Sequence, residues 1–248
     1  MPEIVSKPGF AARMWFYRRA YRKSKKIFTV SEFSKSRITH HLGGKKPVMV
    51  TYTAAQQLFH SFAKNKNTID KNQTIIFIGN IKKHKGLGCL LDAFRQAKSE
   101  GLPHKLIIVG ERNNFRTTDN EILQKDQCND FIEFTGYISD EQLTKYISSA
   151  SLLVQPSLYE GFCLPPLEAL VLGTNVLISD IPVLREIYSG FPVEYFKAGD
   201  ADDLKRKMLE LLQRNIPPPL MPDDLLSKFS FEKTASVIMN ELANQEKW

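Results

Sequence analysis

The sequence has few cysteines and lacks any long apolar run, and both shortages argue against whole classes of protein. Its three cysteines (Cys89, Cys128 and Cys163) stand far apart and include no C-x-x-C pair. This argues against a disulfide framework and favours a reducing compartment. No apolar run approaches the roughly 20 residues needed to span a bilayer. The first residues also lack the apolar stretch and small-residue cleavage site of a signal peptide. We therefore expect a cytoplasmic protein.

Metal-ligand and dinucleotide-binding patterns are absent as well. No group of His, Asp and Cys residues has the spacing of a metal site, and His60 and His104 are expected to be structural or surface residues. No G-x-G-x-x-G follows an expected strand, which argues against a dinucleotide-dependent enzyme. With 42% hydrophobic and 25% charged residues in a chain of 248, the composition is that of an ordinary globular protein.

The positive charge is concentrated at the start of the chain. Residues 1–50 hold 12 Lys and Arg against two acids, whereas the remainder is slightly acidic. Residues 10–26 form a basic helical pattern whose apolar face consists of Phe10, Met14, Tyr17 and Tyr21. This helix could pack its aromatic stripe on its own domain, lie on an anionic membrane surface or touch nucleic acid. The lack of zinc spacing or an RNP pattern argues against nucleic acid.

From residue 74 onward, short apolar runs alternate with helical patterns. Strands are expected at residues 74–80, 105–110, 131–136, 151–157, 175–180 and 193–196. Helices are expected at residues 86–101, 119–128, 139–150, 166–173 and 200–214. Single helices between buried strands predict an α/β fold with a Rossmann-like, doubly wound parallel sheet. Ligands in such sheets bind beyond the carboxyl ends of the strands.

The chain is expected to divide into three parts. Residues 1–60 contain a helix, a strand, a second helix at 31–42 and a second strand at 47–52, which is too little for a closed core of their own. Residues 61–222 contain the expected sheet, and residues 53–73 are polar and irregular like a hinge. Residues 223–248 follow a run of three prolines and end in a helix expected to pack back toward the N-terminal segment.

The segment PSLYEGFCLPPLEAL (156–170) is the strongest local signal. It combines a strand end, a turn at Gly161 and a helix that begins near Pro165, so backbone N–H groups would point beyond the sheet as in a diphosphate site. Glu160 and Glu168 flank the turn and could face one ligand, since a carboxylate can accept from two sugar or ribose hydroxyls. On spacing alone this signal is weak, and two ordinary surface acids are the simpler interpretation.

Four ordered motifs resemble retaining glycosyltransferase family 4, whose fold is the two-domain GT-B arrangement. EGFCLPPLEAL is similar to the family signature E-G-F-G-L-x-x-x-E, and FIGNIKKHKGLGCLLDAF is similar to the phosphate-loop segment G-R-L-x-x-x-K-G. FIEFTGYISDEQLTKYISSASLLVQPS resembles the stretch that holds the nucleotide base, and VSEFSKSRI resembles the end of the N-terminal domain. FSFEKTA resembles the closing helix. The resemblance identifies residues 61–222 as the donor-binding domain and residues 1–60 as a remnant of the acceptor domain.

The resemblance implies roles for residues at matching positions. Glu160 and Lys85 would be the catalytic pair: Glu160 would face the donor sugar, and Lys85 would neutralise the diphosphate leaving group. Glu168 would accept hydrogen bonds from the ribose hydroxyls. The remaining implied donor contacts are Gly79 and Asn80 at the phosphates, Tyr137 and Ile138 beside the base, and Gly161, Phe162, Cys163 and Leu164 around the distal phosphate and sugar. The alternatives are that Lys85 is a solvated loop lysine, which is the less favoured interpretation, and that Tyr137 and Ile138 pack the loop.

The chain departs from the family pattern at two site positions. Asn80 stands where the family usually has an arginine, and Lys82, Lys83 or Arg112 could substitute for that cation. Cys163 stands where the signature has a glycine, and its small side chain need not block the turn. Most of the family's N-terminal domain is also absent.

We therefore predict the donor-binding half of a retaining, metal-independent glycosyltransferase that uses a nucleotide-diphosphate sugar and no further cofactor. Its acceptor would be a glycan or a lipid-linked sugar in the synthesis of a surface polysaccharide such as lipopolysaccharide. Residues 10–26 would contact the inner face of the membrane, and no nucleic acid is expected as a partner. A separately encoded N-terminal half could complete the enzyme. The alternative is a non-catalytic nucleotide-sugar-binding subunit or a truncated remnant.

Overall fold

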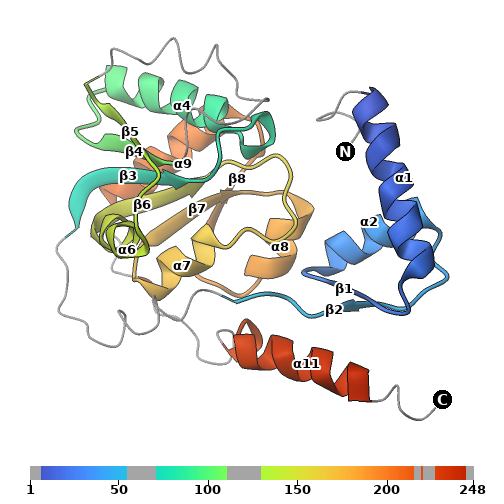
Figure 1. Ribbon diagram of the computed structural model, residues 1–248. Coiled ribbons are helices and arrows are strands. Elements are labelled where there is room, and N and C mark those ends of the chain that lie inside the picture. Colours follow the sequence, from blue (N-terminus) through green and yellow to red (C-terminus); the bar gives the residue numbers. More distant parts are fainter. Residues whose placement is uncertain (1–6, 55–70, 111–129, 215–218, 220–226, 244–248) are drawn as a thin grey trace. The chain divides into compact units, whose positions relative to one another are not determined.

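The structure is a computed structural model that describes residues 7–54, 71–110, 130–214, 219 and 227–243 (Figure 1). The chain divides into two compact units. One unit contains residues 1–54 together with residues 226–248, and the other contains residues 55–225. The second unit holds the segments that carry the strongest motifs.

The larger unit is built on a parallel sheet of six described strands in the order β5-β4-β3-β6-β7-β8. The strands are β3 (Asn72–Ile78), β4 (Lys105–Val109), β5 (Ile132–Gly136), β6 (Ala150–Gln155), β7 (Asn175–Ser179) and β8 (Glu194–Phe196). Every pairing between them is parallel, with Ile76 opposite Ile107 on one side and Leu153 on the other. The predicted Rossmann-like α/β sheet is thus confirmed.

Helices cover both faces of this sheet. They are α4 (Leu87–Ser99), α6 (Asp140–Ser149), α7 (Pro165–Val171), α8 (Pro182–Tyr188) and α9 (Ala201–Gln213). Figure 1 shows α4 on one side of the sheet and α6 and α7 on the other. The sequence did not predict α8, and the helix expected at residues 119–128 lies outside the described residues. The central strands β3, β4, β6 and β7 are apolar on both faces over most of their length, so both helical layers bury them.

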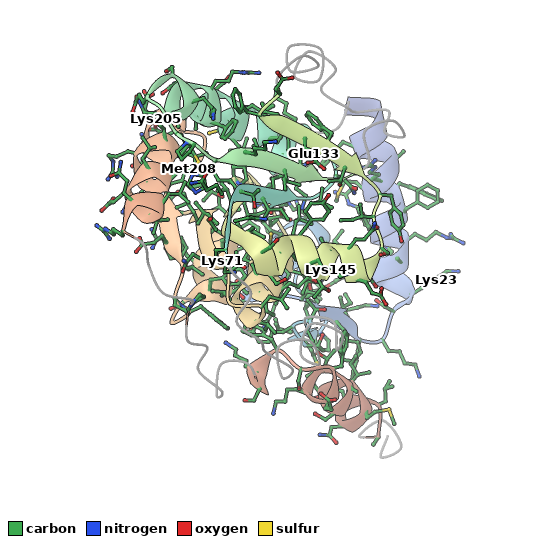
Figure 2. All side chains as sticks on the ribbon, turned by 90° about the vertical axis from the view of Figure 1, so that its left-hand side faces the viewer. Lys23, Lys71, Glu133, Lys145, Lys205 and Met208 are labelled. Atoms are coloured by element: carbon green, nitrogen blue, oxygen red, sulfur yellow. The ribbon has the colours of Figure 1, made fainter. Side chains whose placement is uncertain are left out.

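The core between the sheet and helices α4 and α9 is fully apolar. Phe77 of β3, Phe94 of α4 and Met208 of α9 are all buried in one cluster. Figure 2 labels Met208 and Lys205 on α9; Lys205 Nζ lies 2.7 Å from Glu100 Oε1 at the end of α4. Helix α9 is amphipathic, with Leu204, Met208 and Leu211 buried on one face. Asp200 caps its start, and acids in its first turn favour the helix dipole.

The smaller unit contains α1 (Lys7–Lys23), β1 (Ile27–Thr29), α2 (Glu32–Leu42), β2 (Val48–Val50) and α11 (Phe231–Ala243). Strands β1 and β2 pair in parallel, and Ser31 caps α2 by accepting from the Ser34 N–H at 3.0 Å. Hydrogen bonds at both ends of α11 join it to the N-terminal segment, and one of them runs from Lys26 Nζ to the Glu241 carbonyl oxygen at 2.7 Å. Lys26 Nζ donates to the Glu241 carboxylate at 2.5 Å, and Thr234 Oγ1 donates to the Thr51 carbonyl oxygen at 3.1 Å.

The exposed aromatic face of α1 differs from the predicted stripe. Tyr21 is buried and accepts from the Lys46 N–H at 2.9 Å, whereas Tyr17 is exposed. Its exposed neighbours Trp15 and Phe16 stack edge to face with ring centroids 5.0 Å apart. The predicted stripe therefore splits: its last tyrosine packs within the unit, and a separate group of residues 15–17 faces outward.

None of the described helices is both long enough and apolar enough to cross a membrane.

Candidate functional site

The strongest sequence motifs meet at the point where the sheet changes direction. Strand β3 is followed by β4 on one side, and β6 lies on its other side. Ligands of doubly wound sheets bind in the crevice at such a switch point, beyond the carboxyl ends of the strands. The loop after β3 carries Gly79, Asn80 and Lys85, and the loop after β6 carries residues 156–164. The fold therefore brings the two motif segments to one place.

Backbone contacts fasten these two loops together. The Leu158 N–H donates to the His84 carbonyl oxygen at 2.8 Å. Gly86, the first residue before α4, has a φ of 70°, and a Cβ placed on it would lie 1.9 Å from the Pro156 carbonyl oxygen. Only glycine fits there, because it tolerates this φ and has no side chain. Burial and the adjacent Lys85 lower the pKa of His84, so its ring is neutral at physiological pH.

Lys85 and Glu160 form an ion pair across the junction. Lys85 Nζ lies 2.7 Å from Glu160 Oε1, with the lysine half-buried and the glutamate 8% exposed. Ser157 Oγ donates to the same carboxylate oxygen at 2.7 Å. Gln155 Nε2 in turn donates to Ser157 Oγ at 3.1 Å, and both of these residues are fully buried. A buried carboxylate with a cation and a hydroxyl donor on one oxygen is held in a fixed orientation.

In the turn after Glu160, a cysteine adopts a backbone conformation that usually requires glycine. Cys163 has a φ of 77°, in the left-handed region that side chains disfavour. It is the position where the resembled signature has glycine. Burial raises the pKa of the Cys163 thiol well above its usual value, and the protonated thiol donates to Glu160. A residue in the left-handed region thus stands at the position of the signature glycine, although it is a cysteine.

Helix α7 offers few donors at its own start. Pro165 and Pro166 carry no N–H, and the Leu167 N–H donates to the Leu164 carbonyl oxygen at 2.9 Å and to Tyr188 Oη at 3.1 Å. The sequence pattern predicts backbone N–H donors for a diphosphate at the start of this helix. The backbone N–H groups in the first turn of α7 are therefore absent or already paired.

The remaining predicted site residues lie along the same edge of the sheet. Gly79 follows β3, and the Lys85 Cδ and Cε atoms lie 3.9 Å from the point where a Gly79 Cβ would be. Asn80 is exposed. Tyr137 and Ile138 follow the edge strand β5; Tyr137 is 88% exposed and Ile138 is half-buried. Arg112, a candidate substitute for the family arginine, lies outside the described residues.

Residues 60–222 match the family described as Glycosyl transferases group 1. The chain belongs to this family. The match covers all six strands of the larger unit and both loops of the site.

The glycosyltransferase also resembles individual members and solved structures. It is 28% identical over 201 residues to O-antigen chain mannosyltransferase B of Escherichia coli, covering 77% of this chain and 52% of the relative. It is 24% identical over 244 residues to O-antigen chain mannosyltransferase RfbU of Salmonella typhimurium, covering 96% of this chain and 66% of the relative. The chain thus spans about half to two thirds of the length of these relatives.

Solved structures share the fold at low identity. Sucrose-phosphate synthase from Thermosynechococcus elongatus superposes with a TM-score of 0.76 at 18% identity, covering 98% of this chain and 64% of that one. HepE of Anabaena in complex with UDP-glucose gives a TM-score of 0.76 at 15% identity, covering 98% and 70%. Both likenesses agree with a GT-B type, Rossmann-like fold.

Glu168 of the glycosyltransferase is buried in α7 and has an unusual ionisation. Burial, and secondarily the charge of Asp140, raise the pKa of Glu168 from 4.5 to about 7. An acid whose pKa is raised on folding binds more protons in the folded state, so it costs stability as the pH rises from about 4.5 to about 7. The cost is fully present above that window and absent below it.

We expect Glu168→Gln to stabilise the protein at pH 8 by about 2–3 kcal/mol and to change its stability much less at pH 5. Urea unfolding of both proteins at the two pH values measures this difference. The matched control is Glu194→Gln, which makes the same substitution at a half-buried position on β8. Equal effects of Glu168→Gln at both pH values would contradict the raised pKa.

Three residues that support the site were not predicted from the sequence. Gln155 and Ser157 orient Glu160, and Tyr188 of the unpredicted helix α8 contacts the turn. The signal available for Ser157 was its place directly after a buried strand and three residues before Glu160. Tyr188 gave no such signal, because it is 25 residues from Cys163 in the chain.

Proposed function

We propose that this glycosyltransferase chain is the donor-binding half of a retaining enzyme that uses a nucleotide-diphosphate sugar. Its acceptor would be a glycan or a lipid-linked sugar in the synthesis of a surface polysaccharide. The names of the two relatives, both O-antigen chain mannosyltransferases, support this direction and make a mannosyl donor the first to test. HepE was crystallised with UDP-glucose, which supports the same class of donor.

The ion pair between Lys85 and Glu160 carries the proposal. It places one cation and one carboxylate within 2.7 Å of each other at the switch point of the sheet. A diphosphate would take over Lys85 as its counter-ion, and a sugar hydroxyl would donate to Glu160. Lys85 then stabilises the charge that grows on the diphosphate as the glycosidic bond breaks. This electrostatic role requires no metal ion, so EDTA should not reduce activity.

The other donor contacts follow from the same placement. The backbone of residues 161–164 would border the distal phosphate and the sugar, with Gly79 and Asn80 at the diphosphate. Glu168 would accept from the ribose hydroxyls, and donor binding should then favour its ionised form. Tyr137 and Ile138 would lie beside the base.

A panel of nucleotide sugars, beginning with GDP-mannose and UDP-glucose, tests the proposal. We expect one donor to raise the melting temperature of the full chain and to be slowly hydrolysed or transferred. The anomeric configuration of the product, read by proton NMR, should equal that of the donor. Stabilisation without any turnover would favour the alternative, a nucleotide-sugar-binding subunit that does not transfer. No stabilisation by any member of the panel would contradict donor binding.

We also propose that helix α1 contacts an anionic membrane surface through the exposed residues 15–17. Arg19 lies over the Trp15 ring at 5.8 Å. Further basic residues of the same helix are Arg13, Arg18, Arg22 and Lys23. Aromatic side chains flanked by basic ones are typical of helices that lie in the interface of a charged bilayer. Such contact would bring the enzyme to a lipid-linked acceptor.

Replacing Trp15 and Phe16 together by alanine should lower binding to phosphatidylglycerol vesicles about tenfold, because two aromatic rings no longer enter the interface. Co-sedimentation measures the bound fraction. The matched control replaces Phe231 and Met239 of α11, which are equally exposed but lie on a helix without the basic cluster. Equal losses from both pairs, or no binding by the parent protein, would overturn the proposal.

A further inference from the structure

Tyr188 lies at the centre of the contacts that shape the turn after Glu160. It is the last residue of α8, its side chain is fully buried, and its ring packs edge to face on Phe191 with centroids 5.8 Å apart. Its hydroxyl donates to the Cys163 carbonyl oxygen and accepts from the Leu167 N–H at 3.1 Å. One side chain from outside the motif thus joins the turn to the helix that follows it.

The turn needs such support because it contains a strained residue. A non-glycine residue at φ 77° is disfavoured by roughly 1–2 kcal/mol relative to an extended or helical conformation. Cys163 is buried, so its backbone groups cannot turn to water for compensation. The hydroxyl of Tyr188 supplies a fixed partner to the carbonyl of this same residue, which holds the peptide group in the strained orientation.

We infer that Tyr188 is a positioning residue for donor binding: it holds residues 161–164 in the shape that meets the distal phosphate and the sugar. The inference rests on the proposed function for its ligand. Tyr188 acts through the turn and does not touch the donor. Burial raises the pKa of Tyr188 well above its usual value, so the hydroxyl keeps its proton at any pH at which the protein is studied.

A tyrosine that merely filled the core would behave differently from one that holds the turn. Tyr188→Phe keeps the ring and removes only the hydroxyl. We expect about a tenfold loss of affinity for the nucleoside diphosphate and its sugar, and less than a twofold change for the nucleoside monophosphate. Tyr195→Phe is the matched control, because the Tyr195 hydroxyl donates at 3.5 Å to the Leu184 carbonyl oxygen, away from the turn.

A second variant separates the effect of the hydrogen bond from the Tyr188 hydroxyl to the Cys163 carbonyl oxygen from a general loss of stability. Glycine adopts φ 77° without strain, so the turn no longer depends on the hydroxyl when Cys163→Gly is present. In that background Tyr188→Phe should cost about twofold in diphosphate affinity instead of tenfold. Urea unfolding should show the same coupling, with a smaller effect of Tyr188→Phe beside Cys163→Gly than beside the parent cysteine.

The test is isothermal titration of the full chain and these variants with GDP and GMP, or with UDP and UMP, according to the base found by the panel. Equal losses for diphosphate and monophosphate, or equal losses in both backgrounds, would overturn the inference. If the parent protein binds no nucleotide, the proposed function fails. The urea measurement then still tests whether Tyr188 holds the turn at Cys163, since additive effects of the two substitutions on the free energy of unfolding would refute that role.

Discussion

Gly86→Ala should be among the most destabilising single substitutions in the larger unit. The new Cβ would lie 1.9 Å from the Pro156 carbonyl oxygen, and the residue has a φ of 70°. The left-handed conformation and the steric overlap each cost about 1–3 kcal/mol, so we expect a loss of about 3–5 kcal/mol in the free energy of unfolding. Since native domains are stable by only about 5–15 kcal/mol, the midpoint of urea unfolding should fall strongly.

The control for this prediction lies at the other end of the same helix. Gly101 follows α4 with a φ of 92°, and a Cβ placed on it would meet nothing within 4 Å. Gly101→Ala therefore carries the conformational cost without the overlap and should cost about 1 kcal/mol. Equal effects of the two substitutions would mean that the loop after β3 and the Pro156 segment do not approach each other as closely as described.

Lys85→Ala should abolish most of the affinity for a diphosphate while leaving the affinity for the nucleoside intact. Hydrogen bonds to charged groups contribute about 1.5–3 kcal/mol, which corresponds to a loss of about 10- to 150-fold in diphosphate affinity. The monophosphate of the same nucleoside should lose little, because Lys85 is assigned to the distal part of the donor. Calorimetry with both nucleotides measures the two losses separately.

The matched control is Lys105→Ala, which removes the same charge from an exposed position at the amino end of β4. It lies at the opposite edge of the sheet from Lys85 and should leave both affinities unchanged. Equal losses of diphosphate and monophosphate binding in Lys85→Ala would refute its assigned role. That result would instead indicate a collapse of the junction around Glu160.

The sequence predicted the framework of the larger unit because its signals are local. Apolar runs such as residues 75–77 and 106–109 are buried on both faces, and each ends near a turn residue. The helix expected at residues 139–150 is also present, and Ser139 and Gln142 form a complete capping box at its start. Periodicity and capping depend on neighbours within four residues, so they can be read without the fold.

The supporting contacts of the site could not be read in this way. Helix α8 has only seven residues, which is too few for a clear period, and its Tyr188 reaches Cys163 only after the chain has folded. The exposure of residues 15–17 was not predicted for a related reason. The face of α1 that is covered depends on the hydrogen bond between Tyr21 and Lys46, which is 25 residues away in the chain. Contacts between residues that are distant in the chain depend on tertiary packing, and local sequence patterns do not predict them.

The most direct test of the central claim is to locate the bound donor by hydrogen exchange. The full chain is incubated with the nucleotide sugar selected from the panel, and peptide protection is compared with and without it. The account predicts protection in the peptides that span residues 83–86 and 157–168, with none in the helix α9 peptide that spans residues 202–213. Protection confined to α9 or to the N-terminal helix, with these two loops unchanged, would contradict it.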